Sequence, residues 1–217
     1  MECEIYIVRH GQTDFNRQGI VQGRGVDSSL NDFGRAQAQA FFEAYSHIPF
    51  SHVFMSTLRR TKESAAPFLE IGLPHSFHPE LDEIDWGNQE GQKASKEMRT
   101  YYLEMMDGWR RGELDGRMPQ GESPLEVQGR QRDFIRGALA DYRQSNPEKG
   151  PLLIVSHGRA IRILMCTLLG ESLCKMDEFE HNNLGLYRVR QEEERFVLLD
   201  RNRIDHLEGL SKRFRKQ

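Results

Sequence analysis

The stretch Ile5-Tyr6-Ile7-Val8-Arg9-His10-Gly11-Gln12-Thr13 decides the fold class of this chain. It begins with apolar, mostly β-branched residues that nothing interrupts, so we predict a buried strand that ends at Arg9-His10-Gly11. The carboxyl ends of strands are where α/β proteins bind their ligands. One such stretch is equally compatible with a strand followed by a polar turn and an incidental histidine. A second one, Leu152–Val155 followed by Ser156-His157-Gly158, argues against coincidence.

The composition predicts a single soluble, globular domain. The chain has 217 residues, of which 29% are charged and 37% hydrophobic, and a formal net charge of −3. This balance gives no reason to expect nucleic acid as a partner. The odd number of cysteines, without paired spacing, favours reduced thiols and a cytoplasmic protein. Residues 1–20 resemble no secretory signal. Every apolar run is too short to span a membrane, so we expect no membrane as a partner.

Strands alternate with helices along the chain, which predicts an α/β three-layer sandwich: a mostly parallel central sheet with helices on both faces. We expect one domain over residues 1–210, with a helical insertion at about 88–122 that caps the pocket, and a disordered basic tail at 211–217. Residues 70–92 look irregular. Strands are expected at 5–8, 52–55 and 152–155 and in a hairpin at 184–190 and 196–200; helices are expected at 31–45, 58–69, 93–113, 123–144 and 159–169.

Cationic and imidazole side chains should meet at one edge of this sheet. Two predicted strands end in His-Gly, and a third ends just before Arg59-Arg60. Since parallel strands end at the same edge, two histidines and two or three arginines would converge there. The planar guanidinium fork matches phosphate oxygens, and helix N-termini after the strands would add N–H donors. The pattern therefore predicts an anion pocket.

Phosphoryl transfer is the chemistry that such a pocket suits. It needs positive charge around the transferred group and an in-line nucleophile, which a neutral imidazole nitrogen can be. The leaving oxygen needs a proton donor, and the cluster Asp82-Glu83-Ile84-Asp85 can supply one that later activates water. All parts of a phosphohistidine mechanism without metal or other cofactor are present.

The sequence resembles the histidine phosphatase superfamily, which contains the cofactor-dependent phosphoglycerate mutases. Arg9-His10-Gly11-x-Thr13-x-x-Asn16 is similar to its RHGxTxxN signature. Four further elements follow in the family's order, up to about residue 158. They are Ser56-x-Leu58-x-Arg60, with Thr61 where the family has alanine; Glu83-Ile84-Asp85-Trp86-Gly87-x-x-Glu90-Gly91, of phosphatase type; Gly121-Glu122-Ser123; and Ser156-His157-Gly158.

The resemblance implies a role for each matching residue. His10 would be the phosphorylated nucleophile and Glu83 the acid and base. The residues implied to hold the phosphoryl group are Arg9, Arg60 and His157. The residues implied to contact the substrate are Asn16, Gln22, Glu122 and Gly158. No metal ligand is implied, and the substrate would be a small phosphorylated metabolite.

The residues themselves leave several choices open. Arg59 competes with Arg60, although neighbours on a helix diverge by about 100°, so only one should face the pocket. Asp82 and Asp85 compete with Glu83. The other six histidines have no metal-like spacing and read as surface or structural residues, with substrate contact left open for His75 and His78 beside the acidic cluster. Trp86 and Trp109 are candidates for the pocket mouth, but packing is the favoured interpretation. Arg110, Arg111 and Arg117 fit a solvated helix end better than substrate recognition, and Arg159 adds a cation after the second His-Gly.

We therefore expect a metal-independent phosphomonoesterase that forms a phosphohistidine on His10. The alternatives are a phosphoglycerate mutase and a non-catalytic module that binds phosphorylated ligands on the same fold. The phosphatase-type element after Glu83 and the short chain favour hydrolysis over the mutase, and the presence of every clamp residue argues against the binding module. The sequence names neither the substrate nor the oligomeric state.

Overall fold

The computed structural model describes residues 3–146, 150–193 and 195–210. A six-stranded sheet forms the centre of the fold. The strand order is β3-β2-β4-β1-β5-β6. The pairs β3–β2, β2–β4 and β4–β1 are parallel, whereas the pairs β1–β5 and β5–β6 are antiparallel. The predicted mostly parallel sheet is therefore confirmed. The strands are β1 (Cys3–Arg9), β2 (His52–Met55), β3 (His75–Phe77), β4 (Leu152–Ser156), β5 (Leu186–Glu192) and β6 (Arg195–Arg203).

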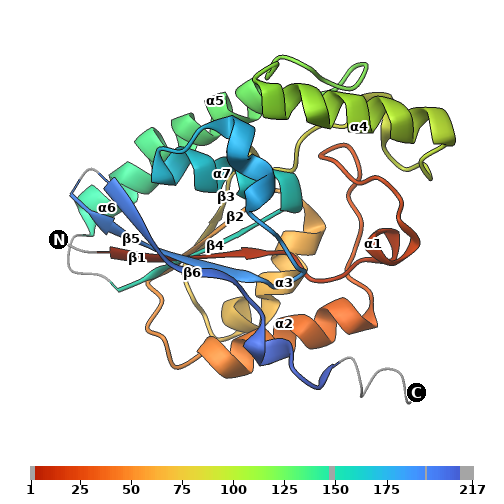
Figure 1. Ribbon diagram of the computed structural model, residues 1–217. Helices are drawn as coiled ribbons and strands as arrows, with labels where there is room; N and C mark the ends of the chain where they lie inside the picture. The colour runs from red at the N-terminus through yellow and green to blue at the C-terminus, as the bar shows by residue number, and fades with distance from the viewer. Residues whose placement is uncertain (1–2, 147–149, 194, 211–217) are drawn as a thin grey trace.

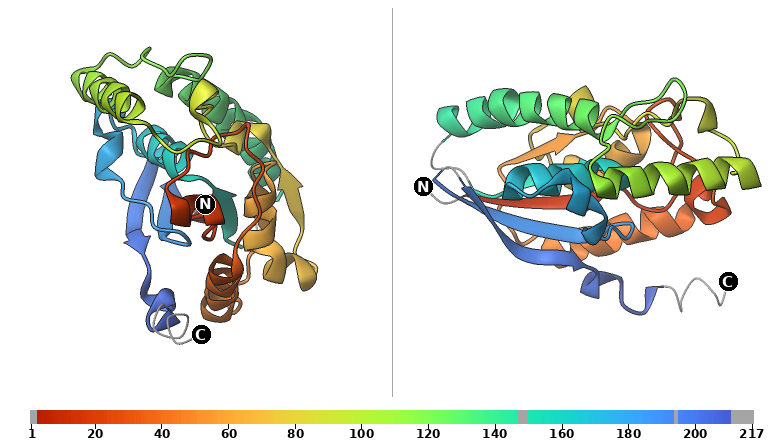
Figure 2. Two further views of the ribbon diagram at one scale, coloured as in Figure 1. Left: turned by 90° about the vertical axis from the view of Figure 1, so that its right-hand side faces the viewer. Right: turned by 45° about the horizontal axis from the view of Figure 1, so that its top comes forward.

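Helices cover both faces of the sheet, as Figure 1 shows, which confirms the predicted three layers. Helices α2 and α3 lie on one face, and α5, α6 and α7 lie on the other with α4 beyond them (Figures 1 and 2). The α-helices are α1 (Asp14–Gln18), α2 (Asp32–Tyr45), α3 (Arg59–Glu70), α4 (Lys96–Arg111), α5 (Pro124–Phe134), α6 (Ala140–Ser145) and α7 (Gly158–Leu169). Shorter helical turns are η1 (Pro79–Leu81), η2 (Gly87–Gln89), η3 (Ile135–Leu139), η4 (Leu173–Glu178) and η5 (Asp205–Leu207).

The inner strands β1 and β4 are buried on both faces because each contributes to two hydrophobic cores. Ile5 and Ile154 point toward α5 and α7, whereas Tyr6 and Val155 point toward α2 and α3. Successive strand residues face opposite sides, so a strand covered on both faces must be apolar throughout. This is why both sequences read as uninterrupted apolar runs that end abruptly in polar residues.

Local capping explains where several helices begin and end. The Asn31 side chain accepts a hydrogen bond from the Gly34 N–H at 2.8 Å and starts α2. Ser123 forms a capping box with Glu126 at the start of α5. Gly170 ends α7 in the left-handed conformation. These three boundaries agree with the predicted ones.

One prediction of local structure is wrong. The region 70–92 is not irregular throughout, because His75–Phe77 pairs with β2; a three-residue edge strand carries too little pattern to be recognised. The hydroxyls of Ser56 and Thr57, just before α3, donate to the Asp82 carboxylate. The helix predicted over 123–144 is present and runs from Pro124 to Ser145, with the π-helical turn Ile135–Leu139 between α5 and α6.

The predicted insertion at 88–122 contains α4, which lies above α7 at the top of Figure 1. The predicted basic tail, 211–217, lies outside the described residues, as does Glu194 of the predicted hairpin turn. Within the described residues, no helix is both long and apolar enough to cross a membrane.

Candidate active site

The carboxyl ends of β1 and β4 form the floor of a small cavity. The two strands are in register there, and the His10 N–H donates to the Ser156 carbonyl at 3.0 Å. The cavity has a volume of about 200 Å³. Its lining comes from the end of β1 and the loop after it, the segment after η1, α4, the start of α7 and the segment before β5. The lining residues are Arg9, His10, Asn16, Ile20, Gln22, Glu83, Trp86, Tyr102, Gly158, Arg159 and His181. Six of the nine residues predicted for the site are among these eleven.

His10 is held as a neutral imidazole with one free nitrogen. Its Nδ1 donates to the Gly11 carbonyl at 2.7 Å, which leaves the Nε2 lone pair without a protein partner among the described residues. Burial lowers the pKa of His10 well below the usual value, and the nearby Arg60 and Arg9 lower it further. A buried neutral imidazole with a free Nε2 is the form in which histidine acts as a nucleophile.

His157 and Arg60 lie directly behind His10 rather than in the cavity lining. The His10 and His157 ring centroids are 5.1 Å apart. Arg60 Nε donates to His157 Nδ1 at 3.1 Å, so the proton of a neutral His157 is on Nε2, which lies 2.7 Å from the Ser56 hydroxyl. Burial and the charge of Arg60 lower the pKa of His157 well below its usual value. Both ring nitrogens are therefore bonded to protein groups.

Arg60 is fully buried, whereas its rival Arg59 is exposed. Its terminal nitrogens donate to the Val26 carbonyl at 2.6 Å and the Gly23 carbonyl at 3.1 Å. The side chain thus ties the glycine-rich loop after β1 to His157. In this arrangement Arg60 supplies positive charge to the pocket from behind.

Arg9 reaches the cavity from the end of β1 and contacts His181. One terminal nitrogen donates to the His181 carbonyl at 3.0 Å and lies 3.3 Å from its Nδ1. Its Nε is buried and has no partner among the described residues. Burial lowers the pKa of Arg9 to about 10, although Glu83 opposes the shift, so the guanidinium stays charged at neutral pH. An unpaired buried N–H on a cation that lines the cavity suits an anionic ligand.

Glu83 faces the same cavity from the loop after η1. Its Oε1 accepts from the N–H groups of Ile84 at 3.0 Å and Ala160 at 2.9 Å, and its Oε2 accepts from Arg159 N–H at 3.1 Å. The carboxylate therefore sits on the N-terminus of α7, where free N–H groups and the helix dipole favour an anion. Because Oε2 accepts only one of these bonds, it retains capacity for a proton or a water.

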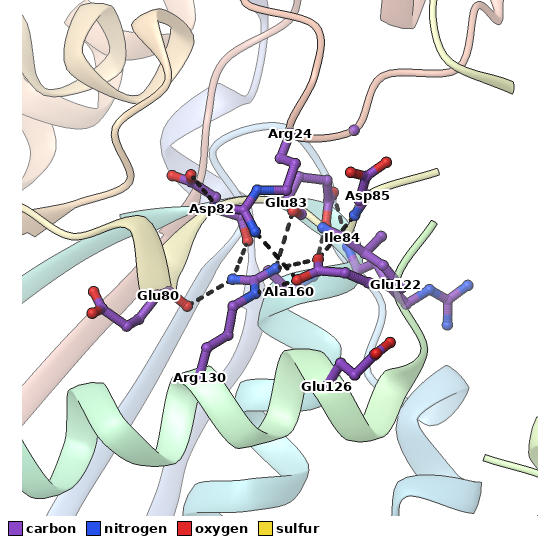
Figure 3. Close-up of polar contacts among 12 residues, drawn as sticks. Arg24, Glu80, Asp82, Glu83, Ile84, Asp85, Glu122, Glu126, Arg130 and Ala160 are labelled. Atoms are coloured by element: carbon purple, nitrogen blue, oxygen red, sulfur yellow. Dashed lines mark hydrogen bonds and ion pairs between the residues drawn. The ribbon is translucent and has the colours of Figure 1, made fainter. Parts of the chain in front are cut away.

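A single arginine holds the backbone of the Glu83 loop (Figure 3). The Arg130 Nη1 donates to the carbonyls of Glu80 and Asp82, each at 2.8 Å, and its Nη2 donates to that of Glu83 at 3.0 Å. The same guanidinium forms a two-bond pair with the Glu122 carboxylate at 3.0 and 3.1 Å. Arg130, from α5, thus fixes the backbone of the loop that carries Glu83.

The rival carboxylates do not line the cavity. Asp82 accepts from the hydroxyls of Ser56 and Thr57 at 2.8 and 2.9 Å, and Asp85 accepts from the Gly87 N–H at 2.7 Å. Glu122, predicted to contact substrate, is also outside the lining. Besides Arg130, it binds Arg24 at 3.3 Å and the Asp85 N–H at 3.0 Å, so the structure places it as an anchor for the loop (Figure 3).

Asn16, Gln22 and Gly158 lie in the lining as predicted. The side-chain oxygen Oδ1 of Asn16 accepts from the Thr13 N–H at 3.1 Å, and Gln22 Nε2 donates to the Thr13 hydroxyl at 2.8 Å. These contacts hold the loop after β1 around the cavity. A Cβ at Gly158 would lie 2.9 Å from His181 Cε1, so glycine permits the close approach of that ring.

Sequence reasoning missed His181 and Tyr102 and judged Trp86 a packing residue, yet all three line the cavity. His181 reaches it because β5 runs antiparallel to β1, which places the chain before β5 at the carboxyl end of β1. No spacing in the sequence reports that pairing. Burial, with the nearby Arg9, lowers the pKa of His181 to about 3. Trp109 is fully buried in the core.

The exposed arginines flagged in the sequence are outside the cavity. Arg111 pairs with Glu113 at 3.1 Å and Arg117 with Glu126 at 2.6 Å, as expected for a solvated surface. Arg110 pairs with Asp107 and reaches Asp177 at 3.2 Å. In the part of the chain that the structure describes, no three His, Cys, Asp or Glu side chains gather as metal ligands would.

The fold is α/β, with His10 and His157 next to each other at the carboxyl ends of two parallel strands, and comparison with known proteins gives the family. The profile described as "Histidine phosphatase superfamily (branch 1)" matches residues 5–204. The chain belongs to this superfamily of enzymes.

Sequence relatives and solved structures agree with this assignment. The chain is 36% identical, over 86% of its length and 84% of the relative's, to a protein of Cronobacter sakazakii named "Probable phosphoglycerate mutase GpmB". Mycobacterial glucosyl-3-phosphoglycerate phosphatase is 25% identical with a TM-score of 0.81, covering 94% of this chain and all of that one (100%). The alpha-ribazole phosphatase of Shigella flexneri has a TM-score of 0.79 at 24% identity, covering 92% and 96%.

Proposed function

We propose that this enzyme is a phosphomonoesterase that needs no metal and hydrolyses a small phosphorylated metabolite through a phosphohistidine on His10. The observation that carries the proposal is the free Nε2 of a neutral His10 in a cavity that also exposes the Arg9 guanidinium and the Glu83 carboxylate. Nucleophile, charge stabiliser and proton-transfer group meet there without a gathered set of metal ligands among the described residues.

The reaction has two steps. In the first, His10 Nε2 attacks phosphorus, an N–P bond forms, and the P–O bond to the leaving group breaks as Glu83 protonates the leaving oxygen. In the second, the Glu83 carboxylate takes a proton from water, the water oxygen attacks phosphorus, and the N–P bond breaks. Arg9 in the cavity, with Arg60 behind it, balances the charge on the phosphoryl oxygens.

Hydrolysis of p-nitrophenyl phosphate in EDTA tests the proposal. Wild-type protein should release phosphate steadily with the chelator present, and His10→Ala should lose at least about a thousandfold in kcat. Rapid acid-free quenching should trap a phosphoenzyme that is labile in acid and stable in base in the wild type only. Retained activity in His10→Ala would refute the mechanism.

A phosphoglycerate mutase is the second candidate, favoured by the name of the 36% identical relative. The two activities separate in one assay. With 3-phosphoglycerate as substrate and 2,3-bisphosphoglycerate as primer, a mutase converts 3- to 2-phosphoglycerate faster than it releases phosphate, whereas a phosphatase releases phosphate faster. If the protein binds phosphoesters but hydrolyses or isomerises none of them, the result would favour the non-catalytic binding module.

A further inference from the structure

The proposed reaction does not use Asp82, a buried carboxylate outside the cavity lining. Asp82 lies just after η1 and is only 4% exposed. Its Oδ1 accepts from the Ser56 hydroxyl at 2.8 Å and from the Thr57 N–H at 2.9 Å. Its main-chain carbonyl is held separately, by Arg130 (Figure 3). The position of the loop therefore does not depend on the Asp82 side chain alone.

A continuous series of hydrogen bonds runs from Asp82 to Arg60. The Ser56 oxygen that donates to Asp82 lies 2.7 Å from His157 Nε2. Arg60 Nε donates to His157 Nδ1 at 3.1 Å. The members of this series, called the Asp82–Arg60 network below, are Asp82, Ser56, His157 and Arg60. All of them are buried, and they come from the segments after η1, β2 and β4 and from α3.

The direction of each hydrogen bond in the network is fixed from both ends. A guanidinium can only donate, so Arg60 requires a lone pair on His157 Nδ1. A carboxylate can only accept, so Asp82 takes the single proton of the Ser56 hydroxyl. The Ser56 oxygen must then accept from His157 Nε2–H, as it also accepts from the Leu58 N–H at 3.1 Å. Asp82 and Arg60 thus favour the same tautomer of His157 from opposite ends.

Loss of the acceptor at Asp82 would disturb this arrangement. The Ser56 hydroxyl could then turn and donate to His157 Nε2, and the histidine proton would have to move to Nδ1. There it would face the N–H of Arg60, so the hydrogen bond that holds this guanidinium to His157 would be lost. Phosphoryl transfer depends on positive charge that is already in position, so a displaced Arg60 would slow the reaction.

We propose that Asp82 is a positioning residue, which acts through Ser56 to hold His157 in its Nε2–H tautomer. Arg60 is thereby kept in place behind the nucleophile. The inference rests on the proposed function for the use of Arg60 in phosphoryl transfer, whereas the tautomer of His157 can be measured without turnover.

Two substitutions at Asp82 test the tautomer directly. Asp82→Asn keeps an acceptor oxygen for Ser56, whereas Asp82→Ala removes it. Nitrogen NMR of protein with isotope-labelled histidine reports which ring nitrogen carries the proton, and His157→Gln identifies the signals of His157. We expect the Nε2–H form in the wild type and in Asp82→Asn, and exchange with the Nδ1–H form in Asp82→Ala. An Nδ1–H form in the wild type, or unchanged signals in Asp82→Ala, would overturn the inference.

Ser56→Ala breaks the network at its centre and leaves Asp82 with the Thr57 N–H as a partner. It should alter the His157 signals as Asp82→Ala does, and it provides the test if Asp82→Ala does not fold, which the Tm of each variant shows.

Thr57→Val is the matched control for the side chain of Asp82. It removes the hydrogen bonds of the Thr57 hydroxyl to the same carboxylate, at 2.9 and 3.0 Å, but leaves Ser56 in place. It should leave both the His157 tautomer and the kinetics unchanged. A change as large as that in Asp82→Ala would show that any disturbance of the loop has this effect and would overturn the inference.

The kinetic effect should not depend on the leaving group, because the network lies behind the nucleophile. In Asp82→Ala and Ser56→Ala, kcat/KM should fall by about 10- to 100-fold for both p-nitrophenyl phosphate and propyl phosphate, the range expected when one buried donor loses its partner. Asp82→Asn should keep most of the wild-type value. Wild-type kinetics in Asp82→Ala would contradict the positioning role.

Binding of inorganic phosphate separates this inference from the proposed function. Phosphate is titrated into the wild type and each folded variant, with the shift in Tm as the readout, so that no turnover is needed. A shift that is reduced in Asp82→Ala and kept in Asp82→Asn supports the network even if the wild type hydrolyses nothing. Equal shifts in all of them would overturn the inference even if the wild type is an active phosphatase.

Discussion

At the residue scale, the site depends on which nitrogen of each histidine carries the proton. Nδ1 of His10 is committed to the Gly11 carbonyl, and both ring nitrogens of His157 are bonded within the protein. The two imidazoles that look equivalent in sequence therefore differ in chemistry. His10 presents a free nitrogen to the cavity, whereas His157 fixes the position of Arg60.

The lowered pKa values of His10, His157 and His181 should make the protein lose stability in mild acid. Unfolded histidine binds a proton below about pH 6.5, but these folded ones do not until much lower pH. Stability is therefore complete above pH 6.5, and the free energy of unfolding falls by up to about 1.4 kcal/mol per histidine for each unit below it.

Urea unfolding at pH 7 and pH 5 measures this slope. His181→Gln should reduce the loss by roughly one histidine's share, about 2 kcal/mol over this interval. The same substitution at the exposed His47 is the control. An identical slope in His181→Gln and wild type would contradict the assignment of the buried neutral form.

A methyl group at Gly158 should disturb substrate binding. In Gly158→Ala the new Cβ would lie 2.9 Å from His181 Cε1, so the ring must move and weaken its contact with Arg9. We expect destabilisation of about 1–3 kcal/mol and a several-fold higher KM for p-nitrophenyl phosphate. Gly129→Ala, in α5 with nothing within 4 Å of the added Cβ, should instead be stabilised by about 0.5–1 kcal/mol with unchanged KM.

At the element scale, two helices together position Glu83, the proposed proton-transfer group. The N-terminus of α7 binds the Glu83 carboxylate, and Arg130 of α5 binds three carbonyls of the same loop (Figure 3). Arg130 is thus a positioning residue for Glu83, with Glu122 completing its pairing. The loop has no regular structure of its own at Glu83, so these contacts decide where the carboxylate lies.

Arg130→Lys should therefore weaken proton transfer to the leaving group more than it weakens phosphoryl binding. Lysine cannot bind the three carbonyls and Glu122 together. We expect kcat/KM for propyl phosphate, whose alkoxide needs a proton, to fall about tenfold more than that for p-nitrophenyl phosphate, whose leaving group needs little help.

Two variants calibrate this measurement. Glu83→Gln should show the same dependence on the leaving group with a larger loss, about 10²- to 10⁴-fold for propyl phosphate. Arg132→Lys, exposed on the same helix, should match the wild type. Equal losses on both substrates in Arg130→Lys would show that Arg130 has only a structural role. Equal losses on both substrates in Glu83→Gln would contradict the role of Glu83 as the acid.

At the scale of the whole molecule, the sheet topology gathers groups from distant parts of the chain. β1 and β4 lie side by side although about 140 residues separate them, so His10 and His157 come together. The antiparallel β5 then brings His181 to Arg9. The Arg9 guanidinium and these neutral imidazoles meet at this edge only in the folded chain.

An oxyanion should accordingly stabilise the folded protein. Orthovanadate at about 100 times its Kd should add roughly 2.7 kcal/mol, a rise in Tm of about 5–10 °C for a chain of this size. Arg9→Met should lose most of that rise, whereas Arg195→Met, exposed on the β5–β6 hairpin, should keep it. An undiminished rise in Arg9→Met would show that the anion binds elsewhere.

The sequence by itself determined the parts of this protein whose physical cause is local. Apolar runs that end in Arg9-His10-Gly11 and Ser156-His157-Gly158 predict strands buried on both faces, and caps such as Asn31 and Ser123 predict helix starts, because neighbouring residues alone produce these patterns. Helix geometry, which is also local, predicts that only one of Arg59 and Arg60 faces inward, and Arg60 is buried whereas Arg59 is exposed. The resemblance, not this geometry, selected Arg60.

Only the tertiary structure decided what depends on pairing between distant segments. The tertiary structure placed His181 and Tyr102 in the cavity lining. It also showed that Glu122 pairs with Arg130 outside the cavity. Sequence spacing carries no record of which strand lies beside β1 or which helix covers the cavity. The stretch at Arg9-His10-Gly11 could be recognised by reading along the chain, whereas the groups that face it could be found only by folding the chain back on itself.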